Sequence, residues 1–238
     1  PTQPDTGTTP PEGGTTPPPV RPPTLAVTKI MAFGDSLTEG ESRGQLLVPT
    51  THDHGTAGVA TSYPAKLLAT LTSTYTGQAA EIRVFNAGVG GERVIGSQAK
   101  DRLITELARY EPEVLLLLHG VNNVNTAEDS LSAIVEAIEE LIEVAHQRRP
   151  GIRVVLASLP PQIPTTKATG GSRVTAFNQQ LPAVAAEEGA DFVDVFSSIN
   201  TQTMLMPDGL HLNEAGNVRL AEIFYAKIRE RFHREPAQ

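Results

Sequence analysis

The chain has 238 residues, which is enough for one domain of ordinary size with a substantial hydrophobic core. Its 19 Lys and Arg against 27 Asp and Glu give a formal net charge of −8, which works against nucleic acid as a partner because its phosphates would be repelled. The sequence contains no cysteine, so disulfides, thiolate metal sites and cysteine nucleophiles are excluded and any chemistry must use oxygen and nitrogen groups.

Residues 1–24 differ in composition from the rest of the chain: nine are proline, seven are threonine, and almost none is large and apolar. Such a segment cannot offset its ordering entropy by burying apolar surface, so we predict a disordered linker followed by one domain over residues 25–238. Pro/Thr-rich spacers suit surroundings outside the cytoplasm, and the sequence starts at Pro1 rather than Met. We therefore expect an exported protein with the linker as a tether.

From Leu25 onward, short apolar runs alternate with amphipathic segments. This alternation predicts an α/β fold in which a five-stranded parallel sheet is covered by helices on both faces. The predicted strands are 26–33, 82–85, 114–118, 154–157 and 192–195. No apolar run approaches the roughly 18 residues that a transmembrane helix needs, so no membrane-spanning segment is expected.

Helical spacing of apolar residues predicts the segments that cover this sheet. The predicted helices are 64–71, 97–110, one with core positions from 131 to 145, 172–188, and one that starts after Asn213 as its N-cap. Ser97 is expected to cap the second of these, and Thr126, followed by Asp129 three residues later, the third. Pro182 argues against continuity of the fourth.

A serine stands directly after the first predicted strand, in the run Gly34-Asp35-Ser36-Leu37. Parallel sheets bind their ligands at the carboxyl ends of the strands, so this hydroxyl has the position of a nucleophile. A serine needs a base within hydrogen-bond reach, and the base needs an orienting group. Asp208-Gly209-Leu210-His211, after the last strand, supplies both, because a tight turn lets the carboxylate of Asp208 fix the tautomer of His211.

Acyl transfer also needs hydrogen-bond donors for the developing oxyanion, and the ends of the second and third strands offer them. The third of these strands is followed by Gly120-Val121-Asn122-Asn123, whose Asn122 amide is one donor, and the N–H of Ser36 is another. A glycine N–H after the second strand can approach a substrate closely. The glycines that can supply it are Gly88, Gly90 and Gly91.

The four segments, taken in order, resemble the GDSL, or SGNH, hydrolase family from about residue 29 to about residue 228. The resemblance implies a three-layer α/β/α, flavodoxin-like fold. One departure is Asn123, because the third segment of the family usually reads Gly-x-Asn-Asp. His119, just before that segment, is a less typical neighbour.

Carried over onto the matching positions, the resemblance assigns a role to each candidate residue. It implies that Ser36 is the nucleophile, with His211 as its base and Asp208 as the orienting carboxylate. It also implies that the oxyanion is bound by the N–H groups of Ser36 and Gly91 and by the amide of Asn122. It calls for no cofactor and no metal.

Three other sequence patterns resemble known sites but lack the context that those sites need. Gly40-Glu41-Ser42-Arg43-Gly44 fits the Gly-x-Ser-x-Gly elbow of α/β-hydrolases, but no strand precedes Ser42 and no helix follows it. Ser97-Gln98-Ala99-Lys100 fits the Ser-x-x-Lys of β-lactamases, but the Lys-Thr-Gly that accompanies it there is missing. His52-Asp53-His54 lies in a polar stretch with no third ligand cluster, so we interpret it as a loop and not as a metal site.

The sequence therefore predicts a serine esterase that hydrolyses carboxylic esters through an acyl-enzyme. Short-chain acyl or acetyl esters on small molecules or on polymers such as carbohydrates are the expected substrates. Two readings stay open beside it. One is a lipid acyl hydrolase of the lysophospholipase or thioesterase type, with phosphodiester hydrolysis also allowed by the triad. The other is a non-catalytic, surface-displayed binding module on the same fold.

Overall fold

The computed structural model describes residues 21–40, 60–166 and 168–236. Most of the predicted linker, the serine at 42 and the His52-Asp53-His54 stretch lie outside these residues. The last residue of the predicted linker, Thr24, lies in a short strand, β1.

The centre of the molecule is a five-stranded parallel sheet in the order β3-β2-β4-β5-β6. Its strands are β2 (Lys29–Gly34), β3 (Arg83–Gly88), β4 (Val114–Leu118), β5 (Arg153–Ala157) and β6 (Asp191–Val193). Renumbered within the sheet, this is the 2-1-3-4-5 order of flavodoxin-like folds, in which ligands bind where the strand order reverses. Here that point lies between β2 and β4, at their carboxyl ends.

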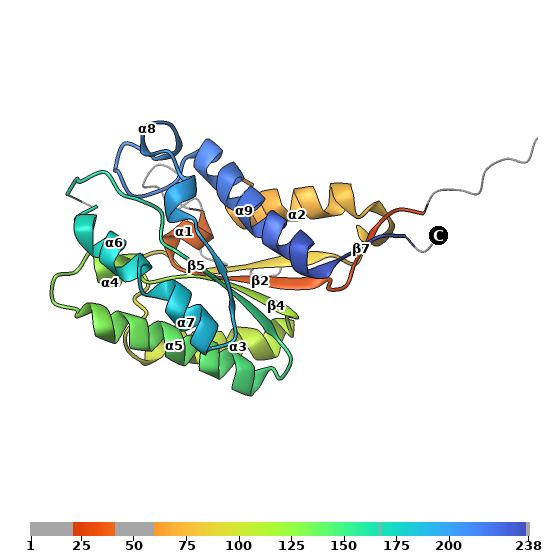
Figure 1. Ribbon diagram of the computed structural model, residues 1–238, viewed down its shortest axis with the longest axis horizontal. Coiled ribbons are helices and arrows are strands. Elements are labelled where there is room, and N and C mark those ends of the chain that lie inside the picture. The colour runs from red at the N-terminus through yellow and green to blue at the C-terminus, as the bar shows by residue number, and fades with distance from the viewer. Residues whose placement is uncertain (1–20, 41–59, 167, 237–238) are drawn as a thin grey trace, which may run out of the picture.

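Helices cover the sheet on both faces (Figure 1), so the structure confirms the predicted three-layer arrangement. The longer helices are α2 (Tyr63–Thr74), α3 (Ser97–Tyr110), α5 (Leu131–Arg148), α6 (Gly171–Asn178), α7 (Leu181–Glu187) and α9 (Glu214–Phe232). In Figure 1, α2 and α9 lie on one face, and α3, α5 and α7 on the other. The short helices are α1 (Ser36–Glu39), α4 (Val121–Val124), α8 (Thr201–Met204), and the 3-10 turns η1 (Thr76–Gln78) and η2 (Phe196–Ser198).

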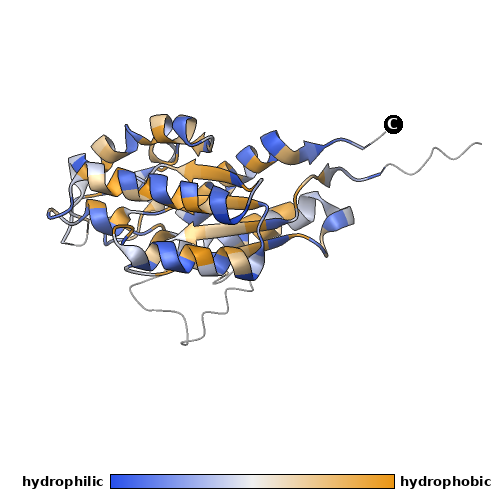
Figure 2. Cartoon of the chain, turned by 90° about the horizontal axis from the view of Figure 1, so that it is seen from below, coloured by the Kyte–Doolittle hydropathy of each residue, from blue (hydrophilic) through white to orange (hydrophobic). Residues whose placement is uncertain are grey.

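The core lies between the sheet and these helices. Every residue of β4 is buried, which agrees with its uninterrupted apolar sequence and central position. On the helices, the apolar residues turn inward and the polar ones outward; Figure 2 shows this as orange and blue stripes along each helix. The sheet is thus fixed from both sides, and its carboxyl edge is left to hold loops.

The predicted strands are all present, and most of their boundaries differ from the predicted ones. β4 is confirmed at both ends, whereas β3 extends to Gly88, beyond the predicted end at residue 85. It does so because Asn86, Ala87 and Gly88 continue the pairing with β2. The prediction ended the strand too early because it followed the apolar run, which the polar Asn86 interrupts. The remaining strands are shifted by one to three residues.

Two predicted helix caps were wrong. α5 begins after Ser130, whose hydroxyl accepts a hydrogen bond from the N–H of Ala133 at 3.2 Å. Thr126 does not cap it, because its hydroxyl donates to the carbonyl of Asn122 at 2.8 Å. Similarly, Ser97 is the first residue of α3 and makes no capping bond, since Gly96 holds the cap position.

The segment predicted as one helix over 172–188 is divided into α6 and α7. Pro182 lies in the first turn of α7, where its missing N–H removes no helical hydrogen bond. Asn213 caps α9 as predicted, accepting from the N–H of Gly216 at 3.1 Å.

The two ends of the described domain meet far from the carboxyl edge of the sheet. β1 (Thr24–Leu25) pairs antiparallel with β7 (His233–Arg234). In Figure 1 this pair lies at the right of the molecule, whereas α1 lies to the left of its centre. Across the described residues, none of the helices combines the length and the apolar character needed to cross a bilayer.

Candidate active site

The predicted nucleophile stands on a tight turn between β2 and α1. Asp35 caps α1, accepting from the N–H of Leu37 at 3.1 Å, and Ser36 is the first helical residue, 4% exposed. Gly34, the last residue of β2, can only be glycine here because a Cβ would lie 2.0 Å from the carbonyl oxygen of Leu118. The turn therefore holds the hydroxyl at the strand end, with the N–H groups of α1 behind it.

The structure brings the three predicted residues of the relay together. The Ser36 Oγ lies 2.9 Å from His211 Nε2, and His211 Nδ1 lies 2.6 Å from Asp208 Oδ2. The other carboxylate oxygen of Asp208 accepts from the N–H groups of Leu210 and His211, each at 3.0 Å. The aspartate thus fixes both the ring and the backbone of the turn that carries it.

The electrostatics of Asp208 favour the tautomer that a general base needs. Burial raises the pKa of this carboxyl, but the hydrogen bonds from the His211 ring and from the N–H groups of Leu210 and His211 outweigh it, so the pKa lies below its usual range. An ionised Asp208 keeps the proton of the ring on Nδ1. The unprotonated Nε2 then faces the Ser36 hydroxyl.

Hydrogen-bond accounting separates the three glycines that could supply an oxyanion donor. The N–H of Gly88 donates to Asn86 Oδ1 at 3.0 Å, and the N–H of Gly90 donates to Glu39 Oε2 at 2.7 Å. The N–H of Gly91 has no acceptor among the described residues. Gly91 also has a φ of 76°, a conformation that L side chains rarely adopt. Of the three, Gly91 alone has its donor available.

The second predicted donor, Asn122, sits in the first turn of α4. Its Nδ2 donates one hydrogen to the carbonyl of Glu92 at 2.8 Å, so the amide is oriented while its second hydrogen is left over. The N–H of Ser36 likewise has no acceptor in the described part of the chain. Each of the three predicted oxyanion donors therefore keeps one N–H hydrogen without an acceptor among the described residues, and each follows a different strand.

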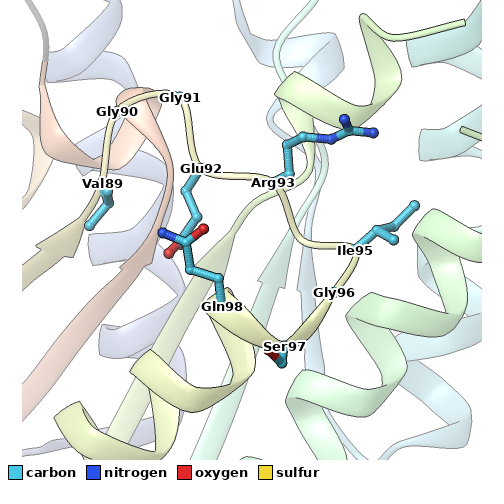
Figure 3. A pocket seen from close by; sticks show the side chains of 9 residues that line it. All are labelled: Val89, Gly90, Gly91, Glu92, Arg93, Ile95, Gly96, Ser97 and Gln98. Atoms are coloured by element: carbon cyan, nitrogen blue, oxygen red, sulfur yellow. The ribbon is translucent and has the colours of Figure 1, made fainter. Parts of the chain in front are cut away.

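A hollow of about 610 Å³ adjoins Gly91 (Figure 3). Figure 3 shows the chain turning over it from Val89 to Gly96 before entering α3, with the side chain of Arg93 pointing away. Its lining is mostly glycine backbone and polar side chains. The lining residues are Val89, Gly90, Gly91, Glu92, Arg93, Ile95, Gly96, Ser97 and Gln98.

A buried ionic cluster, made of Glu92, Arg102 and His119, lies behind this loop. Arg102 holds Glu92 by two hydrogen bonds, from Nε at 2.8 Å and from Nη2. His119 Nε2 lies 2.9 Å from Glu92 Oε2. His119 Nδ1 is 2.8 Å from the N–H of Gly120 but 3.5 Å from Asp35, so we assign it as an acceptor and place the ring proton on Nε2.

This cluster stabilises the charged form of Glu92. Burial raises the pKa of its carboxyl, but the hydrogen bonds from Arg102 and His119 outweigh burial and lower the pKa to about 2. Glu92 and Arg102 were not predicted from the sequence, and His119 stood out there only as an unusual neighbour. The signal that could have found them is a glutamate directly after Gly91, the predicted oxyanion glycine, with an arginine on the inward side of the following helix.

Asn123, the departure from the family pattern, is fully buried and satisfied. Its Oδ1 accepts from the N–H of Val94 at 2.7 Å, and its Nδ2 donates to Asp129 Oδ2 at 2.8 Å. Asp129 also forms an ion pair with Arg93. The carboxylate that the family places at position 123 is thus present nearby, at position 129. Among the described residues, no three acidic or histidine side chains are arranged to hold a metal ion.

Comparison with known protein families shows to which family the chain belongs. A profile of the GDSL-like Lipase/Acylhydrolase family matches residues 32–219, which contain Ser36, Gly91, Asn122 and the turn from Asp208 to His211. The chain belongs to this family. The resemblance that its four motifs predicted is confirmed. Membership in this family makes the protein a carboxylic ester hydrolase. Comparison with curated protein sequences gave no match.

Solved structures share the fold of this GDSL hydrolase at low identity. Est24, a carbohydrate acetylesterase from Sinorhizobium meliloti, is 17% identical with a TM-score of 0.68, and the match covers 85% of this chain and 99% of that one. Axe2, an acetylxylan esterase from Geobacillus stearothermophilus, is 19% identical (TM-score 0.66; 86% and 96% covered). An aryl esterase of M. smegmatis is also 19% identical (TM-score 0.67; 85% and 99% covered).

The low pKa of Glu92 makes the free energy of unfolding depend on pH in the acid range. Because the pKa of Glu92 is about 2 in the folded chain and near its usual value of about 4.3 when unfolded, its ionisation stabilises the fold above that value. This contribution is lost as pH falls from about 4.5 towards 2. Urea unfolding across this range should show a steep loss of unfolding free energy in the wild type and a smaller one in Glu92→Gln. Equal slopes for the two would contradict the ionic cluster.

The second prediction concerns the relocated carboxylate. Asn123→Asp would place a second carboxylate at the 2.8 Å contact with Asp129, removing a hydrogen bond and adding repulsion. We expect the unfolding free energy at pH 7 to fall by about 1–3 kcal/mol. The double variant Asn123→Asp/Asp129→Asn restores the complementary pair and should recover much of this loss. A double variant no more stable than Asn123→Asp, measured in urea, would show that the pair does not act as a unit.

Proposed function

We propose that this GDSL hydrolase is a serine esterase in which Ser36 attacks the ester carbonyl. The observation that carries the proposal is the relay from Ser36 Oγ to His211 Nε2 at 2.9 Å and from His211 Nδ1 to Asp208 at 2.6 Å. As Oγ bonds to the carbonyl carbon, its proton passes to Nε2. The imidazolium then protonates the leaving alkoxide, and an acyl-serine remains.

Water completes the cycle by the same route. It loses a proton to Nε2 of His211 as it attacks the acyl carbon, and collapse of the second tetrahedral intermediate returns the proton to Ser36 and releases the acid. The ionised Asp208 stabilises the imidazolium in both halves of the reaction. The oxyanion of each intermediate accepts from the N–H groups of Ser36 and Gly91 and from the Asn122 amide, which are available for it.

We further propose that the substrates are short-chain acyl esters, above all acetyl esters of carbohydrates. The hollow beside Gly91 supports this, because aliphatic side chains in its lining are limited to Val89 and Ile95, whereas Ser97 and Gln98 can bind hydroxyl groups. A long acyl chain would find little apolar surface there. Two proteins that share the fold are named as a carbohydrate acetylesterase and an acetylxylan esterase, which agrees with the proposal.

The nucleophile is tested by Ser36→Ala, with Ser132→Ala, an exposed serine on α5, as the matched control. We expect the first to lower kcat on p-nitrophenyl acetate by roughly 10⁴-fold or more and the second to leave it unchanged. A fluorophosphonate probe should label the wild type and the control but not Ser36→Ala. Full turnover by Ser36→Ala would overturn the serine mechanism, and failure of the wild type to be labelled or to turn over would favour the binding-module reading.

The substrate class is tested by comparing p-nitrophenyl acetate, butyrate and octanoate with an acetylated xylo-oligosaccharide. We expect kcat/KM to be highest for acetate and to fall with chain length, because the polar lining gives a longer chain no compensating burial. Release of acetate from the oligosaccharide is expected as well. A kcat/KM that rises steadily from acetate to octanoate would instead identify a lipid acyl hydrolase.

A further inference from the structure

Glu92 contacts or adjoins two of the proposed oxyanion donors, the N–H of Gly91 and the amide of Asn122. Gly91, whose N–H is available, precedes it in the chain. The Asn122 amide donates to its main-chain carbonyl at 2.8 Å. A shift of the Glu92 backbone would therefore move one donor directly and release the other from its anchor. The accuracy of both donors depends on how firmly this one residue is held.

The Glu92 carboxylate is buried and hydrogen-bonded to two side chains. It is 1% exposed and receives the two-pronged contact of Arg102 together with the ring of His119. A bidentate arginine–carboxylate pair fixes orientation as well as distance. A carboxylate that is buried and so fully bonded leaves the residue little freedom to rotate.

Arg102 transmits this hold to the strand ends. Its Nη1 donates to the carbonyl of Ala87 at 2.7 Å and its Nη2 to the carbonyl of Gly34 at 3.2 Å. The guanidinium also lies 3.9 Å from the centre of the Phe33 ring. Ala87 is the last residue but one of β3 and Gly34 is the last residue of β2. One guanidinium therefore binds Glu92 to the two strands that precede the proposed oxyanion loop and the nucleophile turn.

We propose that Glu92 is a positioning residue for the oxyanion hole, acting through Arg102 and His119 on the N–H of Gly91 and the amide of Asn122. The inference rests on the proposed serine mechanism and adds to it a residue that touches no substrate. It differs from a merely structural ion pair in what it predicts. A structural role would change stability, whereas a positioning role changes the rate of the chemical step while substrate binding is retained.

The test is a double-mutant cycle of Glu92→Gln and Asn122→Ala, read as kcat and KM on p-nitrophenyl acetate. Glu92→Gln keeps the size of the side chain but weakens the ion pair. We expect kcat to fall about 10- to 100-fold with KM changed less than about threefold, as for a misplaced oxyanion donor. In the Asn122→Ala background, one of the two donors that Glu92 positions is already absent. Glu92→Gln should therefore lower kcat by a clearly smaller factor there than in the wild type.

Two controls separate positioning from unfolding. Glu106→Gln alters a different buried carboxyl, which lies on α3 and outside the cluster, and should keep the wild-type kcat. Thermal unfolding and circular dichroism establish that each variant is folded. If Glu92→Gln does not fold, Arg102→Lys takes its place, because lysine keeps the charge but cannot form the two-pronged contact; it should show the same loss of kcat at nearly constant KM.

The outcomes are distinct. The positioning role is overturned if kcat is unchanged in a folded Glu92→Gln or Arg102→Lys variant. It is also overturned if Glu92→Gln lowers kcat by the same factor in the wild-type and the Asn122→Ala background. A change confined to KM overturns it as well. The proposed serine mechanism is tested in the same assay by Ser36→Ala: if that variant keeps full turnover, the mechanism fails, whereas a dead Ser36→Ala with a wild-type-like Glu92→Gln rejects the positioning role alone.

Discussion

The close approach of three strand ends is the constraint from which the site follows. A Cβ on Gly34 would lie 2.0 Å from the carbonyl oxygen of Leu118, and a Cβ on Gly88 would lie 2.1 Å from the N atom of Glu39. The absence of a side chain at each position lets the end of β2 lie against β4 and the end of β3 lie against α1. The loops that follow are then close enough for one substrate carbonyl to reach donors from all three.

Burial makes the polar groups beneath these loops depend on one another. Glu39 fixes the N–H of Gly90, Asn123 fixes that of Val94, and Glu92 fixes the amide of Asn122. Each of these three side chains has a hydrogen-bond partner, which avoids the cost of burying it unpaired. What remains without an acceptor along the segment from residue 88 to residue 92 is the N–H of Gly91. The N–H that we propose as an oxyanion donor is thus identified by elimination, through the bonds that its neighbours make.

The sequence predicted those parts of the molecule whose signal is local. β4 was placed correctly because its five residues are all apolar, and Asp208 and His211 were paired because three residues separate them in one turn. The contacts of Glu92 could not be predicted in this way. Its partners lie 10 and 27 residues further along the chain, with no periodicity to connect them. Thr126 was misassigned as a cap because its alternative acceptor, a backbone carbonyl, carries no sequence signal.

The pairing of β1 with β7 has a practical consequence. It brings the start and the end of the described domain together beside η1 and the end of α9, while the catalytic loops open at the carboxyl edge of the sheet. A support, reporter or second protein fused just outside either strand would therefore be held away from the mouth that an ester must enter. Immobilised in that orientation, the enzyme would present Ser36, the proposed nucleophile, outward, even to a substrate too large to diffuse.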